Sequence, residues 1–420
     1  MLDLKFIREN IEAVRENIKN KNESASVDSI LELDENRRKV IKEVESLKNL
    51  RNVVTKEISE LKKSKQNADD KIIAMKEVSD KIKDLDDELR KIENDIEELV
   101  LRIPNMVGPN VKAGKSADDN DVIRTWGNPI TQSIKMNHIE IAKKHDIIDF
   151  ERGGKVSGSG FAFYKGKGAK LERAMINFMI DYHIEKHGYT ELLPPFIVNR
   201  NSMHGTGQLP KMADDMYHAS EDDMFLIPTA EVPLTNFHNN EMLQASELPL
   251  KYCGYSPCFR REAGSYGKDV RGFLRVHQFN KVEMVNFVKP SDSWQRLEEL
   301  TNEAEDIVKA LGLHYRVLRL CSGDTSFSSA MTYDIEVWSP GEESWLEVSS
   351  CSNFTDFQAR RASIRFRPEP SAKPEFVHTL NGSGLATSRI MVALLETYLN
   401  EDGSITIPEP LIPYTGFDKI

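Results

Sequence analysis

Two stretches of this sequence combine arginines and glycines in an arrangement that suits the binding of phosphate groups. In the first, Cys258–Met284, an apolar run ends at Arg260 and Glu262. The loop that follows is rich in glycines and cations, namely Gly264, Gly267, Lys268, Arg271, Gly272 and Arg275. It returns into a strand-like segment, 276–288. An arginine fixed at the end of a strand can clamp a phosphate or a carboxylate through two hydrogen bonds, which a lysine cannot do as well.

The second stretch, Asn381–Glu396, has the sequence NGSGLATSRIMVALLE. We expect its glycines to form a turn that opens an amphipathic helix, with Arg389 one turn inside it. The N-terminus of a helix carries partial positive charge and unpaired N–H groups, so together with an internal arginine it suits a polyphosphate. Either stretch by itself is also compatible with a solvated turn that carries incidental cations.

Together the two stretches resemble motifs 2 and 3 of the class II aminoacyl-tRNA synthetases. The segments Thr229–Glu231, FRREAGSYG, HQFNKVEM, EVSSCSN (Glu347–Asn353) and NGSGLA resemble the seryl-tRNA synthetase family in its bacterial and eukaryotic cytosolic form. Five pieces in the right order are specific, and the resemblance covers essentially the whole chain. It implies activation of L-serine with ATP and Mg²⁺ to seryl-adenylate. Transfer of the seryl group to the 3′ end of tRNA(Ser) follows, and acceptance of tRNA(Sec) is a family expectation only.

The resemblance assigns roles around ATP. Arg260 clamps the α-phosphate and the serine carboxylate, Glu262 meets the adenine side, and Phe279 stacks on the adenine ring. The catalytic residues it implies are Arg260, Glu347 and Arg389, with Arg389 at the γ-phosphate end. The residues it implies for ATP binding are Arg260, Arg261, Glu262, Val276, Phe279, Glu347, Val348, Ser349, Ser350 and Arg389. Glu347 and Ser350 match the Mg²⁺ ligands, since carboxylate and hydroxyl oxygens suit a hard cation.

Two of these ATP-site positions leave questions open. The strand alternation of Phe279 with Asn280 and Val282 is as compatible with core packing as with stacking on adenine. Many family members carry a small residue where this chain has Arg261, so the resemblance transfers no role to that side chain.

The resemblance also implies a serine pocket made of Thr229, Ala230, Glu231, Glu283, Asn381 and Ser383. Glu283 lies between Val282 and Met284 in an apolar strand, where an unpaired carboxylate would be costly to bury. A ligand with an ammonium and a hydroxyl group would satisfy that carboxylate. A site built around a ligand hydroxyl rejects the analogue that lacks it by about 10⁴-fold or more.

The N-terminal quarter has the periodicity of a coiled coil. Apolar residues recur in steps of three and four from Met75 to Ile103, and the same heptad runs from Val40 to Leu61 with an interruption at Arg51. The polar segment 64–70 separates the two runs. We therefore expect an antiparallel helical hairpin.

The charges of the two predicted helices are sorted by sign. Residues 36–65 carry ten cations and four anions, a net charge of +6, whereas residues 69–100 carry six cations and twelve anions, a net charge of −6. The pattern alone favours salt bridges between the helices. The resemblance favours a basic helix that holds the long variable arm of the tRNA, with Lys48, Arg51, Lys56 and Lys63 as the expected contacts.

The expected organisation is a tRNA-binding arm over 1–103, a linker over 104–129 and a catalytic domain over 130–420. Prolines, glycine and the run of acidic residues at 118–121 mark the linker. Beyond it, short apolar strands alternate with separate helices, so we expect an α+β fold built on an antiparallel sheet flanked by helices. The segment Leu171–Asn199 reads as a helix and a strand. It resembles motif 1, with Pro195 at the motif's proline, and implies a homodimer.

Composition narrows the alternatives. The net charge of −11 gives no global signature of a nucleic-acid binder, although RNA contact needs only a local basic patch. The four cysteines have no CxxC pair and no histidine at finger spacing, so we expect no zinc, free thiols and a cytoplasmic location. Apolar runs are too short for a membrane span, and the N-terminus lacks the features of a signal peptide.

Two other functions remain open at this stage. An amino acid ligase that loads a carrier protein would share the core, but such relatives lack the long hairpin and use a zinc-type pocket. A non-catalytic RNA-binding paralogue would be expected to lose one of Arg260, Glu283, Glu347 or Arg389, and all four are present.

Overall fold

The computed structural model describes residues 1–130, 134–263 and 271–420. The predicted loop residues Gly264, Gly267 and Lys268 therefore lie outside the described residues. The chain divides into two compact units. One consists of Leu2–Lys19 and Glu23–Pro104, and the other of Met1, Asn20–Asn22 and Asn105–Ile420.

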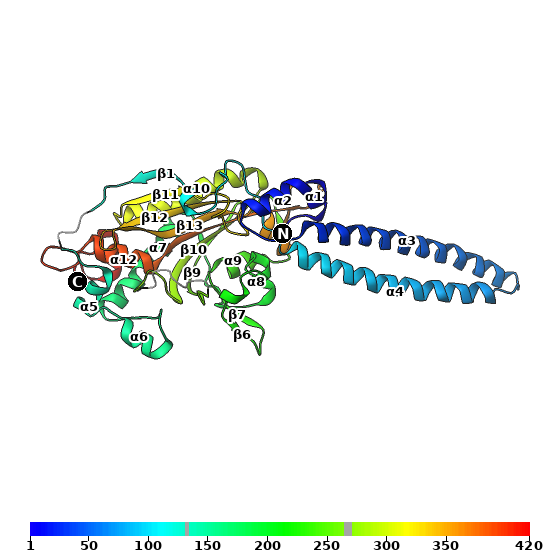
Figure 1. The fold of residues 1–420 in the computed structure, drawn as a ribbon, viewed down its shortest axis with the longest axis horizontal. Coiled ribbons are helices and arrows are strands. Elements are labelled where there is room, and N and C mark those ends of the chain that lie inside the picture. The colour runs from blue at the N-terminus through cyan, green and yellow to red at the C-terminus, as the bar shows by residue number, and fades with distance from the viewer. Residues whose placement is uncertain (131–133, 264–270) are drawn as a thin grey trace. The chain divides into compact units, whose positions relative to one another are not determined.

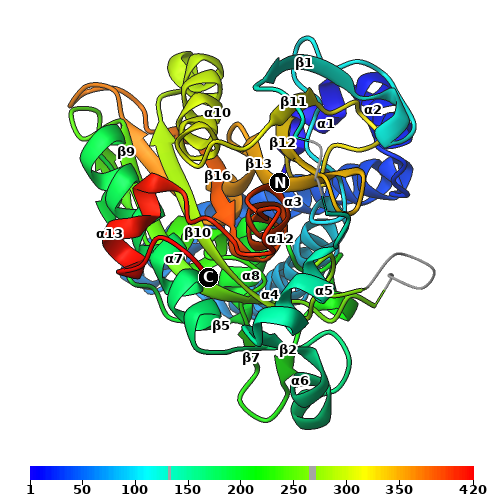
Figure 2. The same ribbon diagram turned by 90° about the vertical axis from the view of Figure 1, so that its left-hand side faces the viewer.

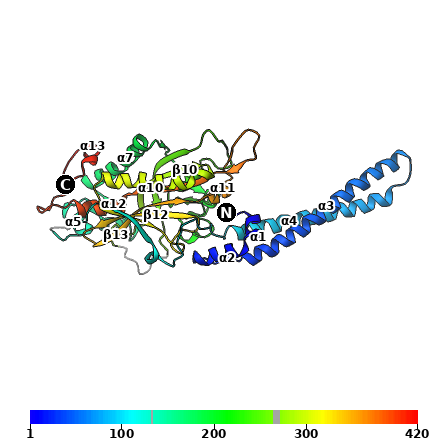
Figure 3. The same cartoon turned by 90° about the horizontal axis from the view of Figure 1, so that it is seen from above.

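The first unit is helical and contains the predicted hairpin. Its helices are α1 (Leu4–Glu9), α2 (Ile11–Asn20), α3 (Val27–Lys63) and α4 (Asp69–Val100). The long helices α3 and α4 run side by side and are joined by a short turn (Figures 1 and 3). Seam positions such as Val40, Val44, Ile82 and Ile92 are buried, because heptad spacing keeps them facing the partner helix.

Ion pairs cross between the two helices of the hairpin. Lys48 Nζ lies 3.0 Å from Asp86, and Lys81 Nζ lies 2.7 Å from Glu43. Lys48 thus forms a salt bridge between the two helices, as the distribution of charges in the sequence predicted. Among the other expected RNA contacts, Lys56 and Lys63 are exposed, whereas Arg51 is half-buried in its seam position.

The second unit is built on an eight-stranded, mostly antiparallel sheet with the order β1-β11-β12-β13-β16-β10-β9-β4. Its strands are β1 (Asp121–Trp126), β4 (Thr190–Glu191), β9 (Leu250–Phe259), β10 (Gln278–Val288), β11 (Tyr315–Arg319), β12 (Met331–Ser339), β13 (Ser344–Asn353) and β16 (His378–Ala386). Smaller sheets contain β2 (Ile148–Asp149) with β3 (Phe163–Tyr164), β5 (Ile197–Asn199) with β6 (His218–Ala219) and β7 (Met224–Leu226), and β8 (Met242–Gln244) with β14 (Arg365–Arg367) and β15 (Glu375–Phe376). The predicted α+β class is confirmed.

Helices α7, α10 and α12 pack along the central strands of this sheet (Figure 2). The helices of this unit are α5 (His138–His145), α6 (Phe150–Ser157), α7 (Lys167–His187), α8 (Arg200–Thr206), α9 (Glu231–Asn236), α10 (Ser293–Ala310), α11 (Phe357–Arg361), α12 (Thr387–Thr397) and α13 (Ile412–Thr415). Strand residues at alternate positions, such as Val282, Met284 and Ile335, form one apolar cluster with these helices. The intervening positions face the other side of the sheet, which leaves that side free for polar groups.

Two local expectations differ from the structure. The segment 104–129, expected to be a linker, contains β1, which pairs with β11 at the edge of the large sheet. The predicted turn at Asn381–Ala386 is instead the second half of β16. Glycines had indicated a turn there, but Gly382 and Gly384 sit in a crowded strand, where an added Cβ would lie within 3.0 Å of Cys351 and His183.

The end of helix α7 and the state of the cysteines agree with what the sequence predicts. Helix α7 ends at Gly188, which has φ of +68°, so the predicted stop of the motif 1 helix is confirmed. All four cysteines are buried and unpaired, as expected of small apolar side chains. In the part of the chain that the structure describes, no helix has the length and apolar character needed to cross a membrane.

Candidate active site

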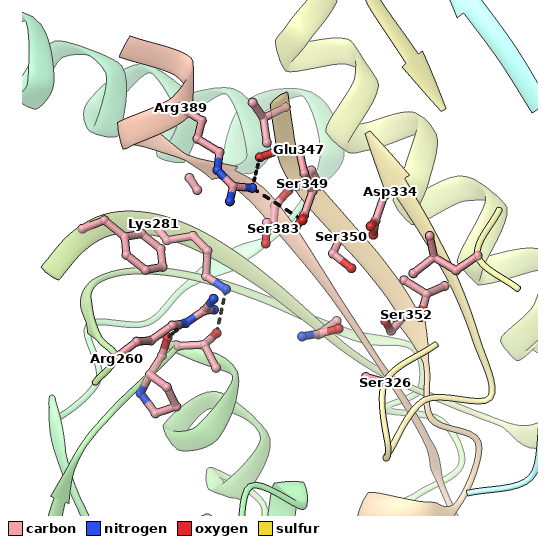
Figure 4. Close-up of a pocket in the computed structure, with 18 of the residues that line it drawn as sticks. Arg260, Lys281, Ser326, Asp334, Glu347, Ser349, Ser350, Ser352, Ser383 and Arg389 are labelled. Carbon is pink, nitrogen blue, oxygen red and sulfur yellow. Dashed lines mark hydrogen bonds and ion pairs between the residues drawn. The ribbon is translucent and has the colours of Figure 1, made fainter. Parts of the chain in front are cut away.

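A cleft of about 920 Å³ lies on the face of the large sheet opposite α7, α10 and α12. Side chains from β10, β11, β12, β13 and β16 form its floor, and residues that follow β9 and begin α12 form its walls. Arg260 and Lys281 lie on one side of the cleft, and Arg389, Glu347, Ser350 and Asp334 lie on the other (Figure 4). The two predicted phosphate-binding stretches therefore meet in one site.

A β-bulge in β13 places Glu347 and Ser350 on the same face of the sheet. Residues three apart in a regular strand point to opposite faces. Here the pairing with β12 shifts, so that Ser350 pairs with Asp334 and Glu347 pairs with Glu336. Both therefore line the cleft. Such bulges re-aim side chains next to active sites.

A second bulge lies in β16, next to the residues predicted for a serine pocket. Lys281 pairs with Ala386 and Glu283 with Ser383, so β16 has one extra residue at this point. Leu385 in this segment has φ of +138°. The irregularity brings Asn381 and Ser383 to the cleft.

Arg389 lies in the first turn of α12, and its side chain lines the cleft. Its Nη1 donates to the carbonyl oxygen of Glu347 at 2.8 Å and lies 3.5 Å from the Glu347 carboxylate. Its Nε donates to the carbonyl oxygen of Leu274 at 3.3 Å. These contacts fix the direction of a guanidinium that remains partly exposed to the cleft.

Arg260 is held just beyond the end of β9. Its main-chain N–H donates to the carbonyl oxygen of His277 at 2.9 Å, which continues the pairing with β10. The guanidinium lies 5.1 Å from the centre of the Phe279 ring. Phe279 is half-buried and lines the cleft, so one side of its ring packs against Arg260 instead of the core. Arg275 forms an ion pair with Glu262 at the same end of the cleft.

The carboxylate of Glu283 already has protein partners. It forms an ion pair with Lys281, accepts a hydrogen bond from Thr229 Oγ1 at 2.8 Å, and accepts one from Asn381 Nδ2 at 3.3 Å. This carboxylate is therefore paired within the protein, before any ligand with an ammonium and a hydroxyl group binds. A fully buried carboxylate needs a paired charge within the protein, and Lys281, two residues earlier on the same strand face, supplies it.

Glu231, at the start of α9, is the second carboxylate of this pocket. Burial and the nearby charge of Glu283 together raise its pKa to about 7, and a hydrogen bond from Gln358 opposes this rise. That bond, from Gln358 Nε2, is 2.6 Å long. A carboxyl group held between its neutral and ionised forms near pH 7 can respond to a cationic ligand.

The oxygen atoms around the β13 bulge suit a hard cation. Oδ1 of Asp334 is buried and has no hydrogen-bond partner among the described residues. Burial raises the pKa of Asp334 well above its usual range, and the charge of Glu347 adds to this effect. A divalent cation would relieve both penalties, because carboxylate and hydroxyl oxygens are its preferred ligands. Glu347, Ser350 and Asp334 therefore fit Mg²⁺.

The structure does not bring every predicted residue to the cleft. Val276, Val348 and Ser349 line it together with Glu262 and Phe279. Glu283 is completely buried and does not itself line the cleft, although its partners Lys281, Thr229 and Asn381 do. Ala230 packs in an apolar cluster, and Arg261 is an exposed side chain that donates to the carbonyl oxygen of Asp214.

Sequence reasoning missed several residues of the site. Lys281 could have been found, because it alternates with Phe279 and Glu283 on one strand face. Gln358 and Asp334 had no local signal, since each is brought in by pairing between distant segments.

Comparisons with known proteins agree with this geometry. Residues 215–398 match the tRNA synthetase class II core domain (G, H, P, S and T), and residues 1–107 match the seryl-tRNA synthetase N-terminal domain. A serine–tRNA ligase of Geobacter sulfurreducens is 55% identical over 417 residues, which cover 99% of each chain. One of Chloroherpeton thalassium is 56% identical over 426 residues and the whole of both chains.

A solved structure agrees as well. Seryl-tRNA synthetase from Pyrococcus horikoshii, complexed with ATP, superposes with a TM-score of 0.94 at 39% identity and covers 100% of this chain and 99% of its own. These matches cover both the helical hairpin and the unit that contains the arginine-lined cleft. The chain belongs to the seryl-tRNA synthetase family of class II aminoacyl-tRNA synthetases.

Proposed function

We propose that this chain is a serine–tRNA ligase, which activates L-serine with ATP and transfers the seryl group to tRNA(Ser). The observation that carries the proposal is the buried cluster of Glu283, Lys281, Thr229 and Asn381 at the end of an arginine-lined cleft. This cluster offers hydrogen-bonding groups for a small polar amino acid, and the arginines offer positive charge for phosphates.

In the first step, an oxygen of the serine carboxylate attacks the α-phosphorus of ATP and the bond to the departing pyrophosphate breaks. Two anionic groups must approach each other, so fixed positive charge supplies much of the rate enhancement. We assign Arg260 to the serine carboxylate and the α-phosphate, and Phe279, whose ring centre lies 5.1 Å from the Arg260 guanidinium, to the adenine ring. We assign Arg389 to the far end of the triphosphate. Mg²⁺, held by Glu347, Ser350 and Asp334, would neutralise phosphate charge.

Specificity for serine follows from the polar groups in the pocket. Thr229, Asn381 and Ser383 can pair with the hydroxyl and ammonium of the ligand, and Glu231 offers a carboxylate for the ammonium. Alanine or glycine would leave some of these buried groups unpaired, and the loss of such partners is costly. We infer that the pocket rejects threonine through its additional methyl group.

In the second step, a terminal hydroxyl of the tRNA attacks the carbonyl carbon of the adenylate, and AMP leaves. We propose that residues 1–103 form the tRNA-binding arm, with Lys56, Lys63, Lys48 and Arg51 on or near the contact surface, and that residues 130–420 form the catalytic domain. Charging of tRNA(Sec) rests on the same arm. We also propose that the reaction needs no zinc and that the protein is cytoplasmic.

We further propose a homodimer formed through α7 and the segment that follows it. Leu193 and Ile197, on either side of Pro194 and Pro195, are 78% and 51% exposed. Large apolar side chains that remain exposed close together mark an association surface. Sedimentation of the purified protein at a mass near one chain would contradict this part of the proposal.

Serine-dependent exchange of pyrophosphate into ATP, without tRNA, tests the function. Wild type should exchange with serine and at least about 10²-fold less with alanine or threonine. Arg389→Ala should slow exchange by about 10²-fold or more, the scale for loss of one preorganised donor. Arg367→Ala, in β14, is the matched control and should leave the rate unchanged. Exchange that is equal with all amino acids, or absent from a folded wild type, would contradict the proposal.

A further inference from the structure

His138, the first residue of α5, lies outside every set of residues assigned above. It is completely buried. Its Nδ1 lies 3.2 Å from Oε1 of Glu342 and 3.4 Å from Oε1 of Glu396, and its main-chain N–H donates to Glu396 at 2.9 Å. On the other side of the ring, Nε2 accepts a hydrogen bond from the main-chain N–H of Phe273 at 3.2 Å.

These contacts assign the tautomer of the ring. Because Phe273 donates to Nε2, that nitrogen must present its lone pair, so the neutral ring carries its proton on Nδ1. Nδ1 lies close to the two carboxylates, at 3.2 and 3.4 Å, but neither contact has the geometry of a hydrogen bond. Glu396 is itself held in place, since it also accepts hydrogen bonds from Ser339 Oγ and from the main-chain N–H of Gly341. Glu396 thus holds the main chain at the start of α5, and the hydrogen bond from Phe273 assigns the tautomer of the ring.

The main chain that His138 holds is part of the ATP site. Gly272 precedes Phe273 with φ of +56°, and a Cβ on it would lie 2.0 Å from His138 Nε2. The next residues line the cleft. The carbonyl oxygen of Leu274 accepts the hydrogen bond from Arg389, and Arg275 pairs with Glu262. The hydrogen bond at Phe273 thus holds the residue next to Leu274 and Arg275. These two residues contact Arg389 and Glu262, which are proposed to bind opposite ends of ATP.

A metal ion among His138, Glu342 and Glu396 is the alternative explanation, since these ligand atoms lie within 4.8 Å of one another. A metal would bind the lone pair of Nδ1, which forces the proton of the neutral ring onto Nε2. That proton would then face the N–H of Phe273 at 3.2 Å, two donors without an acceptor. The hydrogen bond from Phe273 therefore favours a proton on Nδ1 over a metal ion bound to Nδ1.

We infer that His138 is a positioning residue of the ATP site: with its main chain held by Glu396 and with Nε2 as an acceptor, it holds the main chain at Phe273 and, through Leu274 and Arg275, orients Arg389 and Glu262. The inference rests on the proposed function, because it assigns ATP to this cleft. His138 itself does not contact the proposed ligands.

Two variants test the two sides of the ring separately, and a third variant is the control. The amide of asparagine reaches the place of Nδ1 and that of glutamine the place of Nε2, so His138→Asn loses the acceptor for Phe273 whereas His138→Gln retains it. The control is His378→Asn, which removes a half-buried histidine that contacts Ser293, away from the cleft. Serine-dependent pyrophosphate exchange gives KM for ATP and for serine, and thermal unfolding reports the fold. Native mass spectrometry of wild type and of His138→Asn reports bound metal.

His138→Asn should raise KM for ATP about tenfold or more, because small displacements of orienting groups weaken catalysis steeply. KM for serine should change by less than about threefold. His138→Gln and His378→Asn should keep KM for ATP within about threefold of wild type. An unchanged KM for ATP in His138→Asn, or equal rises of both KM values, would overturn the inference. So would one equivalent of bound metal that His138→Asn loses. Absence of exchange in wild type would instead refute the proposed function.

Discussion

At the scale of single residues, two buried carboxylates share the proposed serine pocket but have different partners. Glu283 is neutralised by Lys281, whereas Glu231 accepts a hydrogen bond from the neutral amide of Gln358. Close like charges cannot both remain ionised without compensation, so the poorly compensated group takes the raised pKa. Glu231 is therefore the group whose charge can change when a cationic ligand binds.

Binding of serine should depend on pH through Glu231. Its pKa is about 7 in the free protein, so the carboxyl is mostly neutral below pH 7 and must lose a proton before it can pair with an ammonium. Each pH unit below the pKa then costs about 1.4 kcal/mol. KM for serine, measured by pyrophosphate exchange, should be about tenfold higher at pH 6 than at pH 8.

Glu231→Gln is the control for this prediction. It cannot titrate, so KM for serine should be high at both pH values and nearly independent of pH. A pH dependence of the same size in Glu231→Gln would show that another group is responsible.

At the scale of elements, irregularities in two strands assemble the site. The bulge in β13 turns Glu347 toward the cleft beside Ser350, and the extra residue in β16 keeps Ser383 opposite Glu283. A regular strand would bury one member of each pair among the helices on the other face. The chemistry of the cleft thus depends on the pairing of β12 with β13 and of β10 with β16.

The pairing of β12 with β13 predicts a role for Asp334 in binding the cation. Asp334→Asn keeps the shape of the side chain but removes a charge, so the Mg²⁺ concentration for half-maximal exchange should rise about tenfold or more. The thermal unfolding midpoint should not fall, since the variant removes a buried carboxylate oxygen that lacks a hydrogen-bond partner among the described residues.

The matched variant is Asp324→Asn, at an exposed position of the cleft rim. It should leave the Mg²⁺ requirement unchanged. Equal Mg²⁺ curves for wild type and Asp334→Asn would limit the cation site to Glu347 and Ser350.

At the scale of the whole molecule, the residues proposed for serine activation and those proposed for tRNA binding belong to different units of the chain. All the former lie between Thr229 and Arg389, and the latter lie on α3. The two activities should therefore be separable.

Removal of residues 42–92, with a short Gly/Ser linker across the shortened hairpin, tests this separation. The truncation keeps Asp34 and its ion pair with Arg8 at 3.0 Å, so the base of the arm should remain folded. Serine-dependent exchange should persist within about threefold, because an exchange assay without tRNA needs only the cleft. Charging of tRNA should fall sharply. Charging equal to that of the full chain would mean that the hairpin is only structural.

A milder variant, Lys56→Gln with Lys63→Gln, should weaken tRNA binding and reduce its salt dependence by about 0.7–0.9 log units for each lost phosphate contact. Lys83→Gln with Lys91→Gln, exposed on α4, is the control of equal charge and should have little effect.

The sequence by itself determined the hairpin, the α+β class and the family. Heptads specify a helical seam locally, since each step of three or four residues returns to the same face of a helix. Motif residues such as Arg260 and Arg389 were identifiable because short stretches of chain carry them. Helix α7 likewise ends where a single glycine permits a left-handed residue.

Only the tertiary structure decided how the motifs combine. Strand bulges leave no mark in the alternation of residue types along a sequence. The glycines of Asn381–Ala386 are typical of a turn, but this segment forms part of strand β16. The partners of Glu283 and Glu231, and the pairing of Asp334 with Ser350, depend on contacts between distant segments. His138 lies more than 130 residues from the Phe273 that it holds. Such contacts are set by the packing of the whole sheet, which a local pattern does not encode.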